Sequence, residues 1–347
     1  MQPTFVLSTG RCGSTLLSHI LHRHPEVLSI SELFCAIQVH PDDLRTGRLS
    51  GQEFWDLLSA PQPFLDVMIQ GEFPIDELRY RRGSGRFSPE TGIPGICHMT
   101  LPLLTSDPDT LFDVLAADVP SWPARPAASQ FSVLFDRLAA RFGRTVVVER
   151  TGGSVMMAPL LHAMFPTAKF VHMHRDGPDC ALSMSRHPGA RVLGLAEHAG
   201  LLGGAPPGSA PPPGPLSPQL AAALTPPLDA WAVMACPNPP LQTYGRLWSR
   251  MVTIGAAVLR RLPPSQWTTL AYEDLITDPD RELSRLAEFI GARLVPGWLP
   301  ASRGMIGSSR VGQASALDPD DLCALQVACE PGRQAIEEMT AESLPPA

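Results

Sequence analysis

The stretch that decides the fold is residues 4–32, TFVLSTGRCGSTLLSHILHRHPEVLSISE. It opens with an apolar run, residues 5–7, that is typical of a buried strand. A polar turn follows at residues 8–15, and apolar side chains at helical spacing come next: Leu16, Leu17, Ile20 and Leu21. A strand, a glycine-bearing turn and a helix form an anion site, because the N–H groups of the turn and of the helix start converge on one point. We therefore predict a phosphate-type ligand at this turn.

The turn differs from the GxxxxGK[ST] loop of nucleotide triphosphatases. Gly10 and Gly13 are closer together than in that pattern, and no lysine follows them, since Lys169 is the only lysine in the chain. Here the cation, Arg11, precedes the second glycine and offers a fork of hydrogen-bond donors. The alternative interpretation of the turn is an ordinary strand-to-helix connection without a ligand.

A second candidate anion site lies in residues 169–188, KFVHMHRDGPDCALSMSRHP. An apolar strand ends just before Arg175, and Ser183 follows eight residues later on a predicted helix. Ligands of open parallel sheets bind at the carboxyl ends of the strands, so we expect Arg175 to face the same crevice as residues 8–15. An arginine fork and a serine hydroxyl suit a phosphate on a ribose.

These two patterns resemble those of sulfotransferases that use 3′-phosphoadenosine 5′-phosphosulfate (PAPS). The order R-x-G-[ST]-T resembles their 5′-phosphosulfate loop, and the spacing of Arg175 and Ser183 resembles their 3′-phosphate motif. The resemblance covers roughly residues 4–32, 145–190 and 245–313. It implies that the following residues bind the nucleotide: Arg11, Cys12, Gly13, Ser14, Thr15, Arg175 and Ser183.

Two later segments resemble further landmarks of these enzymes. The segment YEDL at residues 272–275 implies that Tyr272 lies beside the nucleotide. The segment SSRVGQ at residues 308–313 implies that Arg310 comes from a late loop that closes over the nucleotide. Ala314 stands where relatives commonly have a tryptophan.

The resemblance also implies the chemistry, an in-line transfer with a loose transition state that needs cations and a base for the acceptor hydroxyl. The histidine base of the cytosolic phenol and steroid enzymes is missing, because residue 152 is glycine. Tyrosylprotein and carbohydrate-type enzymes use a glutamate just after the first helix, and Glu32 lies there, 21 residues past Arg11. We predict Glu32 as general base, with His98 as the rival base. Arg11 and Arg150 are the predicted catalytic cations, and Arg150 stands where relatives have a lysine.

Composition narrows the class of protein. The chain has 347 residues, 44% of them hydrophobic, and a net charge of −7, so no overall positive field favours nucleic acid or anionic membrane. Seven cysteines, an odd number without CxxC spacing, favour a reduced, cytoplasmic protein. No apolar run is long enough for a membrane span. We expect no metal ion in the site, and the oligomeric state stays open.

The expected fold is a P-loop-NTPase-like α/β sandwich of three layers, with a central parallel sheet and helices on both faces. Residues 1–347 are expected to form one sulfotransferase domain, with an acceptor-side region at about 33–140 and a Pro/Gly-rich insertion at about 194–240. Within this insertion, the low-complexity run at residues 203–219, GGAPPGSAPPPGPLSPQ, is expected to lack regular core structure. A basic loop is expected at residues 79–86, RYRRGSGR, and two separate helices are expected near 318–329 and 331–340.

The predicted function is sulfuryl transfer from PAPS to a hydroxyl of a carbohydrate, a small natural product or a peptide. Two alternatives remain. One is a non-catalytic nucleotide-binding relative, which Arg150 and Ala314 would fit. The other is a P-loop-like kinase, which the missing loop lysine disfavours.

Overall fold

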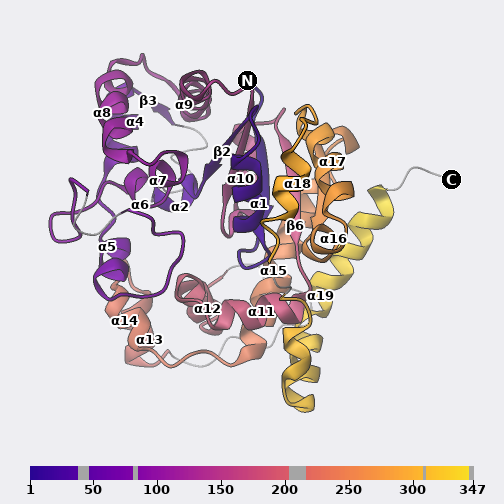
Figure 1. Cartoon of the computed structure of the whole chain (residues 1–347). Helices are drawn as coiled ribbons and strands as arrows, with labels where there is room; N and C mark the ends of the chain where they lie inside the picture. The colour runs from indigo at the N-terminus through magenta and orange to yellow at the C-terminus, as the bar shows by residue number, and fades with distance from the viewer. Residues whose placement is uncertain (38–46, 81–84, 203–215, 308–309, 344–347) are drawn as a thin grey trace.

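The computed structural model describes residues 1–37, 47–80, 85–202, 216–307 and 310–343 (Figure 1). Five parallel strands form the central sheet in the order β2-β5-β1-β6-β7. This confirms the predicted α/β class and parallel sheet. The strands are β1 (Thr4–Ser8), β2 (Val27–Ser31), β5 (Val146–Thr151), β6 (Lys169–His174) and β7 (Trp267–Ala271). A short antiparallel pair, β3 (Arg48–Leu49) and β4 (Arg125–Pro126), lies apart from it.

The register of the sheet brings the ends of its inner strands to one edge. Leu7 of β1 lies opposite Thr151 of β5 on one side and His172 of β6 on the other. Ser31 of β2 lies opposite Arg150. Because all five strands are parallel, the turns that follow them share this edge, where open α/β sheets bind ligands.

Helices cover both faces of the sheet. The chain moves from β1 through α1 to β2 and, in the opposite direction across the sheet, from β5 through α10 to β6. Right-handed crossovers in opposite directions place α1 and α10 on opposite faces. The helices before β6 are α1 (Ser14–His22), α2 (Leu33–Ala36), α4 (Gly51–Ser59), α5 (Pro63–Gln70), α6 (Gly95–His98), α7 (Thr100–Leu104), α8 (Pro108–Asp118), α9 (Ala127–Phe142) and α10 (Ala158–Met164).

The second half of the chain adds the outer helices. The longest described helices, α15 and α19, pack against each other, and α11 packs on α15. The helices after β6 are α11 (Gly177–Ser185), α12 (Arg191–His198), α13 (Pro218–Leu224), α14 (Ala230–Ala235), α15 (Leu241–Leu259), α16 (Tyr272–Thr277), α17 (Pro279–Ile290), α18 (Trp298–Arg303) and α19 (Pro319–Ser343).

The structure adds detail to one expectation about the second half and corrects another. Within the expected insertion at about 194–240, α13 and α14 form and bury Ala223 and Val233 in a small second core. Most of the Pro/Gly-rich run falls at 203–215, outside the described residues. The two expected terminal helices are one helix, α19, with Pro331 inside it. Packing against α15 keeps α19 continuous at Pro331, although a proline usually ends a helix.

Candidate active site

The turn after β1 has the backbone geometry of a close-approach loop. Gly13, the N-cap of α1, has φ +89°, and a Cβ atom there would lie 2.3 Å from the Tyr272 ring. Only glycine fits this position, because side chains are disfavoured at such φ values and the ring leaves no room. Arg11 also has a positive φ, 58°, which is uncommon for a residue with a side chain.

Arg11 connects the two candidate phosphate sites. Its Nε donates to the Ser183 hydroxyl at 3.3 Å, across 172 residues of sequence. The main-chain carbonyl of Arg11 accepts from Arg175 at 3.4 Å. The structure thus brings together the turn after β1 and the turn after β6, as the sequence predicts. Cys12 is fully buried and packs in the core beneath the turn.

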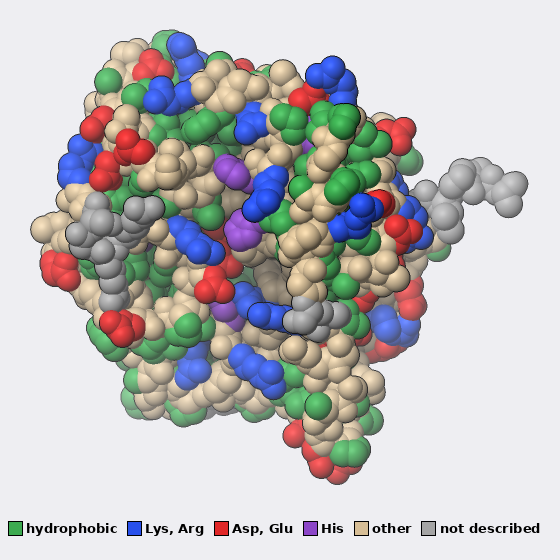
Figure 2. Space-filling model, viewed as in Figure 1, with side chains coloured by type: hydrophobic (Ala, Val, Ile, Leu, Met, Phe, Trp, Pro, Cys, Tyr) green, Lys and Arg blue, Asp and Glu red, His purple; other side chains and the backbone are tan. Residues whose placement is uncertain are grey.

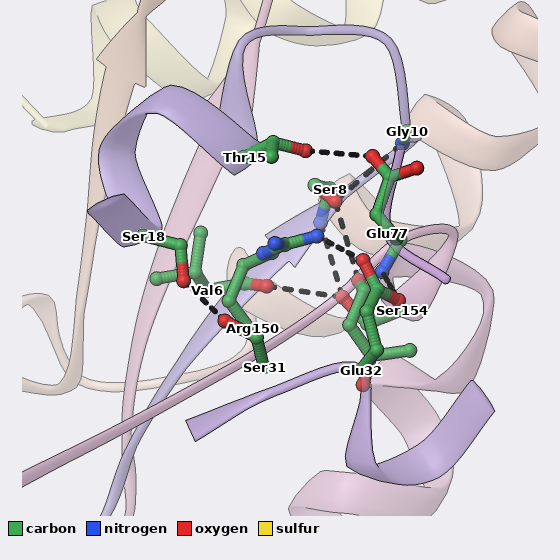
Figure 3. Close-up of polar contacts among 12 residues, drawn as sticks. Val6, Ser8, Gly10, Thr15, Ser18, Ser31, Glu32, Glu77, Arg150 and Ser154 are labelled. Atoms are coloured by element: carbon green, nitrogen blue, oxygen red, sulfur yellow. Dashed lines mark hydrogen bonds and ion pairs between the residues drawn. The ribbon is translucent and has the colours of Figure 1, made fainter. Parts of the chain in front are cut away.

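Glu32 lies beside this turn, where two contacts hold its carboxylate and a third holds its backbone. One oxygen accepts from an Nη of Arg150 in a close contact, and the other accepts from the Gly152 N–H at 2.9 Å. The backbone N–H of Glu32 donates to the Arg150 carbonyl at 2.8 Å. Glu32 is 5% exposed and has φ +57°. Figure 3 shows the Glu32 and Arg150 side chains facing each other above the strand ends.

The positive φ at Glu32 and Arg11 is backbone strain at two of the predicted catalytic residues. Strain of this kind costs about 1–3 kcal/mol per residue and persists only where the surroundings over-determine it. At Glu32 the surroundings are the ion pair and two backbone hydrogen bonds. The fold therefore fixes this carboxylate in one orientation.

A second carboxyl group, that of Glu149, precedes Arg150 on β5. It is fully buried, one oxygen accepts from the Thr151 hydroxyl at 2.6 Å, and the other has no partner among the described residues. Burial, the largest cause, raises the pKa of Glu149 to about 8, and the negative charge of Glu32 adds to the shift. Glu149 is thus held largely in its neutral form at neutral pH.

Arg175 lies at the end of β6 and contacts the late loop. One Nη donates to Asp179 at 3.1 Å and, in a close contact, to the Arg310 carbonyl. Its guanidinium lies 5.1 Å from the centre of the Tyr272 ring, a cation–π distance. Arg175 is 4% exposed, and its Nε has no partner among the described residues. The predicted residues Arg175, Tyr272 and Arg310 therefore lie together.

Asp179 organises this corner, although the sequence analysis did not identify it. Its carboxylate accepts from the N–H groups of Gly312 and Ala314, at 2.7 and 2.8 Å, as well as from Arg175. Asp179 is 2% exposed. Its position one helical turn after Arg175 is the only local signal, because its other partners lie more than 130 residues away.

A cavity of about 240 Å³ opens beside the turn after β1. Arg11, Thr15, Glu32 and Arg150 line it on one side, and mostly apolar side chains line it on the other. Thr15 donates to Glu77, another wall residue, at 3.0 Å. Charged and histidine side chains gather around a hollow near the middle of this face in Figure 2. A larger cavity of about 560 Å³ lies between the start of α11 and the middle of α19; Arg175 lines it, whereas Arg11 and Glu32 do not.

His98, the rival base, and Arg86 of the basic loop do not line this cavity. His98 is fully buried and contacts Asp66 at 3.0 Å, which favours a structural role for the rival base. Of the basic loop at 79–86, residues 81–84 fall outside the described residues, and Arg86 pairs with Asp113.

Neither a metal-binding cluster nor a membrane-spanning helix is found among the described residues. In the described ranges, no three His, Cys, Asp or Glu side chains group closely enough to hold a metal ion. None of the helices there combines the length and apolar character that a bilayer crossing would need.

Comparisons with known proteins point to one family and one fold. Residues 99–193 match the model of a sulfotransferase family. The sulfotransferase domain of the curacin biosynthetic pathway has a similar structure, with a TM-score of 0.50, 15% identity, and coverage of 97% of this chain and 96% of that one. No curated protein matches the sequence significantly.

Two further solved structures show weaker likeness. The sulfotransferase domain of the Synechococcus PCC 7002 olefin synthase matches with a TM-score of 0.42 and 16% identity, covering 100% of this chain and 96% of that one. The sulfotransferase STF9 of Mycobacterium avium matches with a TM-score of 0.42 and 15% identity, covering 98% and 76%. The family match and the shared α/β fold together confirm that this chain resembles the sulfotransferase family.

Proposed function

We propose that this chain is a PAPS-dependent sulfotransferase that acts on a hydroxyl group, with Glu32 as general base. The observation that carries the proposal is the meeting of three features at one sheet edge. These are the Arg11 turn, the Arg175 corner and the buried, oriented carboxylate of Glu32. Residues 1–347 then form one catalytic domain.

The donors left unpaired in the site fit an anionic ligand. Arg150 and Arg175 are 2% and 4% exposed, and the Nε of each has no partner among the described residues. Buried polar groups without partners are rare in native proteins, so these two donors fit the oxygen atoms of a bound anion. The phosphate groups and the sulfuryl group of PAPS accept such hydrogen bonds, and Arg11, Gly13, Ser14 and Thr15 would surround the 5′ end.

PAPS supplies an activated sulfuryl group, and the residues of the chain prepare its acceptor. Glu32 would take the hydroxyl proton as the acceptor oxygen bonds to sulfur and the bond from sulfur to the phosphate oxygen breaks. The electron pair of that bond leaves with adenosine 3′,5′-bisphosphate. A carboxylate keeps lone pairs beyond those used by Arg150 and Gly152, so Glu32 can still accept a proton.

Arg11 and Arg150 would offset the charge that develops on the leaving oxygen. Arg150 carries a permanent charge in a position where it contacts the proposed base directly. This contact gives it a second role, because it fixes the orientation of the Glu32 carboxylate. Arg175, Ser183, Tyr272 and Arg310 would bind the 3′-phosphate and the adenosine.

The experiment that tests the proposal measures acceptor-dependent release of adenosine 3′,5′-bisphosphate from PAPS, without added metal. We expect release to require a hydroxyl-bearing acceptor and to yield an equal amount of sulfated product. Turnover of ATP with Mg²⁺ instead would favour a kinase. Tight nucleotide binding without turnover on any hydroxyl acceptor would favour a non-catalytic relative.

A further inference from the structure

Apart from the phosphate-binding turn, Glu32 and Arg150, most side chains that line the 240 Å³ cavity are apolar, and we call this part of the lining the apolar wall. Four elements or segments supply it: α5, the segment after α5, α12 and α15. The large apolar side chains on this wall are Phe64, Leu65, Ile75, Leu78, Leu193 and Leu247.

Five of these six side chains are half-buried, and Leu247 is fully buried. The half-buried ones therefore leave apolar surface facing the cavity, next to a carboxylate and two arginines. Apolar surface that lines a concave site is typical of a ligand-binding site. A ligand that covers this surface removes it from water, which is favourable.

Three methionines complete this wall. Met99, Met184 and Met251 also line the cavity, and each is at most 3% exposed. Methionine is unbranched and polarisable, so it adapts to irregular apolar shapes. The wall is thus both apolar and adaptable.

Few polar groups are available on the acceptor side. Besides the proposed catalytic residues, the charged or ionisable side chains that line the cavity are Cys35, Glu77 and His187. One Glu77 oxygen accepts from the Thr15 hydroxyl, and His187 Nδ1 accepts from the Gly189 N–H at 3.2 Å. The other Glu77 oxygen has no hydrogen-bond partner among the described residues and lies 3.9 Å from His187 Nε2, so one acceptor remains for a substrate hydroxyl. Burial lowers the pKa of His187, and the charge of Arg11 adds to that shift. A sugar bound here would bury hydroxyl groups without enough partners, which is unfavourable.

We infer that the acceptor is an apolar alcohol, a hydrocarbon ring or chain that carries an isolated hydroxyl, rather than a carbohydrate. The hydrocarbon covers the wall formed by α5, α12 and α15, and the hydroxyl lies at Glu32. This inference rests on the proposed function and narrows its acceptor class.

A matched pair of acceptors tests the inference. Cyclohexylmethanol and methyl glucopyranoside both present a primary hydroxyl on a six-membered ring, and the sugar adds ring hydroxyls. With radiolabelled PAPS, we expect kcat/KM for cyclohexylmethanol to exceed that for the glucoside at least about a hundredfold, the discrimination that an apolar pocket reaches against a single added hydroxyl. Equal or better use of the glucoside would overturn the inference, as would no transfer to cyclohexylmethanol.

A variant of the wall gives an independent readout. Leu193→Gln should raise KM for cyclohexylmethanol about tenfold, because a polar group replaces apolar contact surface. Binding of adenosine 3′,5′-bisphosphate should stay unchanged. Val327→Gln is the control, because Val327 is 69% exposed on α19 and does not line the cavity. An unchanged KM in Leu193→Gln would contradict the inference.

Nucleotide binding distinguishes a failure of the apolar-acceptor inference from a failure of the proposed function. If adenosine 3′,5′-bisphosphate binds and only the glucoside is sulfated, the apolar acceptor is wrong while the proposed function stands. If the nucleotide does not bind, the proposed function fails and the inference fails with it.

Discussion

Replacing Glu32 by glutamine removes one negative charge from a buried ion pair and changes the side-chain volume little. The glutamine oxygen still accepts from Gly152 or Arg150, so the geometry is largely kept. Arg150, 2% exposed, is left without a counter-charge. Breaking a buried ion pair in this way lowers the free energy of unfolding by about 3–5 kcal/mol. Because one hydrogen bond is retained, we expect the loss in Glu32→Gln to lie near the lower limit of this range.

The catalytic effect of Glu32→Gln is separate from this loss of stability. A general base contributes about 100- to 10,000-fold to a rate, so kcat for sulfuryl transfer should fall by that factor. Affinity for adenosine 3′,5′-bisphosphate should change little, because Glu32 is expected to face the acceptor. Transfer is measured at saturating PAPS, well below the unfolding temperature, and stability is measured by urea denaturation.

A double variant separates the charge effect from the base effect. Glu32→Gln with Arg150→Gln should recover part of the lost stability, since the unpaired charge is gone, but none of the activity. If Glu32→Gln keeps most of the wild-type kcat, Glu32 is not the base. If its stability equals that of the wild type, the ion pair does not contribute as argued.

Three further predictions concern other parts of the site. Arg175→Ala should weaken binding of adenosine 3′,5′-bisphosphate at least about tenfold by calorimetry, since each charge-assisted hydrogen bond contributes about 1.5–3 kcal/mol; unchanged affinity would refute the 3′-phosphate assignment. Asp179→Asn should release the loop at Gly312, seen as faster proteolysis there and weaker nucleotide binding, whereas wild-type cleavage rates would show that other contacts hold it. The pKa of Glu149 is raised from 4.5 to about 8, so the folded state holds its proton longer than the unfolded state and stability falls as pH rises through that window. Glu149→Gln should remove up to about 1.4 kcal/mol per pH unit of this slope in urea denaturation between pH 5 and 8, and parallel curves would contradict the assignment.

The sequence predicted the central fold because its signals are local. The apolar runs of β1, β5 and β6 and the short turns after them indicate a parallel sheet, and the observed central sheet is parallel. The continuous α19 was not predictable, because Pro331 normally ends a helix and only packing on α15 overrides it. The helices α13 and α14 were hidden by the proline-rich composition around them.

At the candidate site, too, local sequence signals could be predicted and long-range contacts could not. Arg11, Arg175 and Glu32 follow predicted strands or belong to short motifs, so their shared location could be predicted. The pairing of Glu32 with Arg150 joins residues 118 apart, and that of Asp179 with Gly312 joins residues 133 apart. No local pattern encodes such contacts, because they depend on how whole elements pack. The roles of these residues remain predictions.

The measurement that tests the central claim most directly is calorimetric titration of the full chain with adenosine 3′,5′-bisphosphate, beside adenosine 5′-phosphate and ATP, without metal. The two anion sites at Arg11 and Arg175 predict roughly micromolar binding, about −8 kcal/mol, that is lost when the 3′-phosphate is absent. Equal or tighter binding of ATP, or no binding of any of the three nucleotides, would contradict the assignment of this site to PAPS.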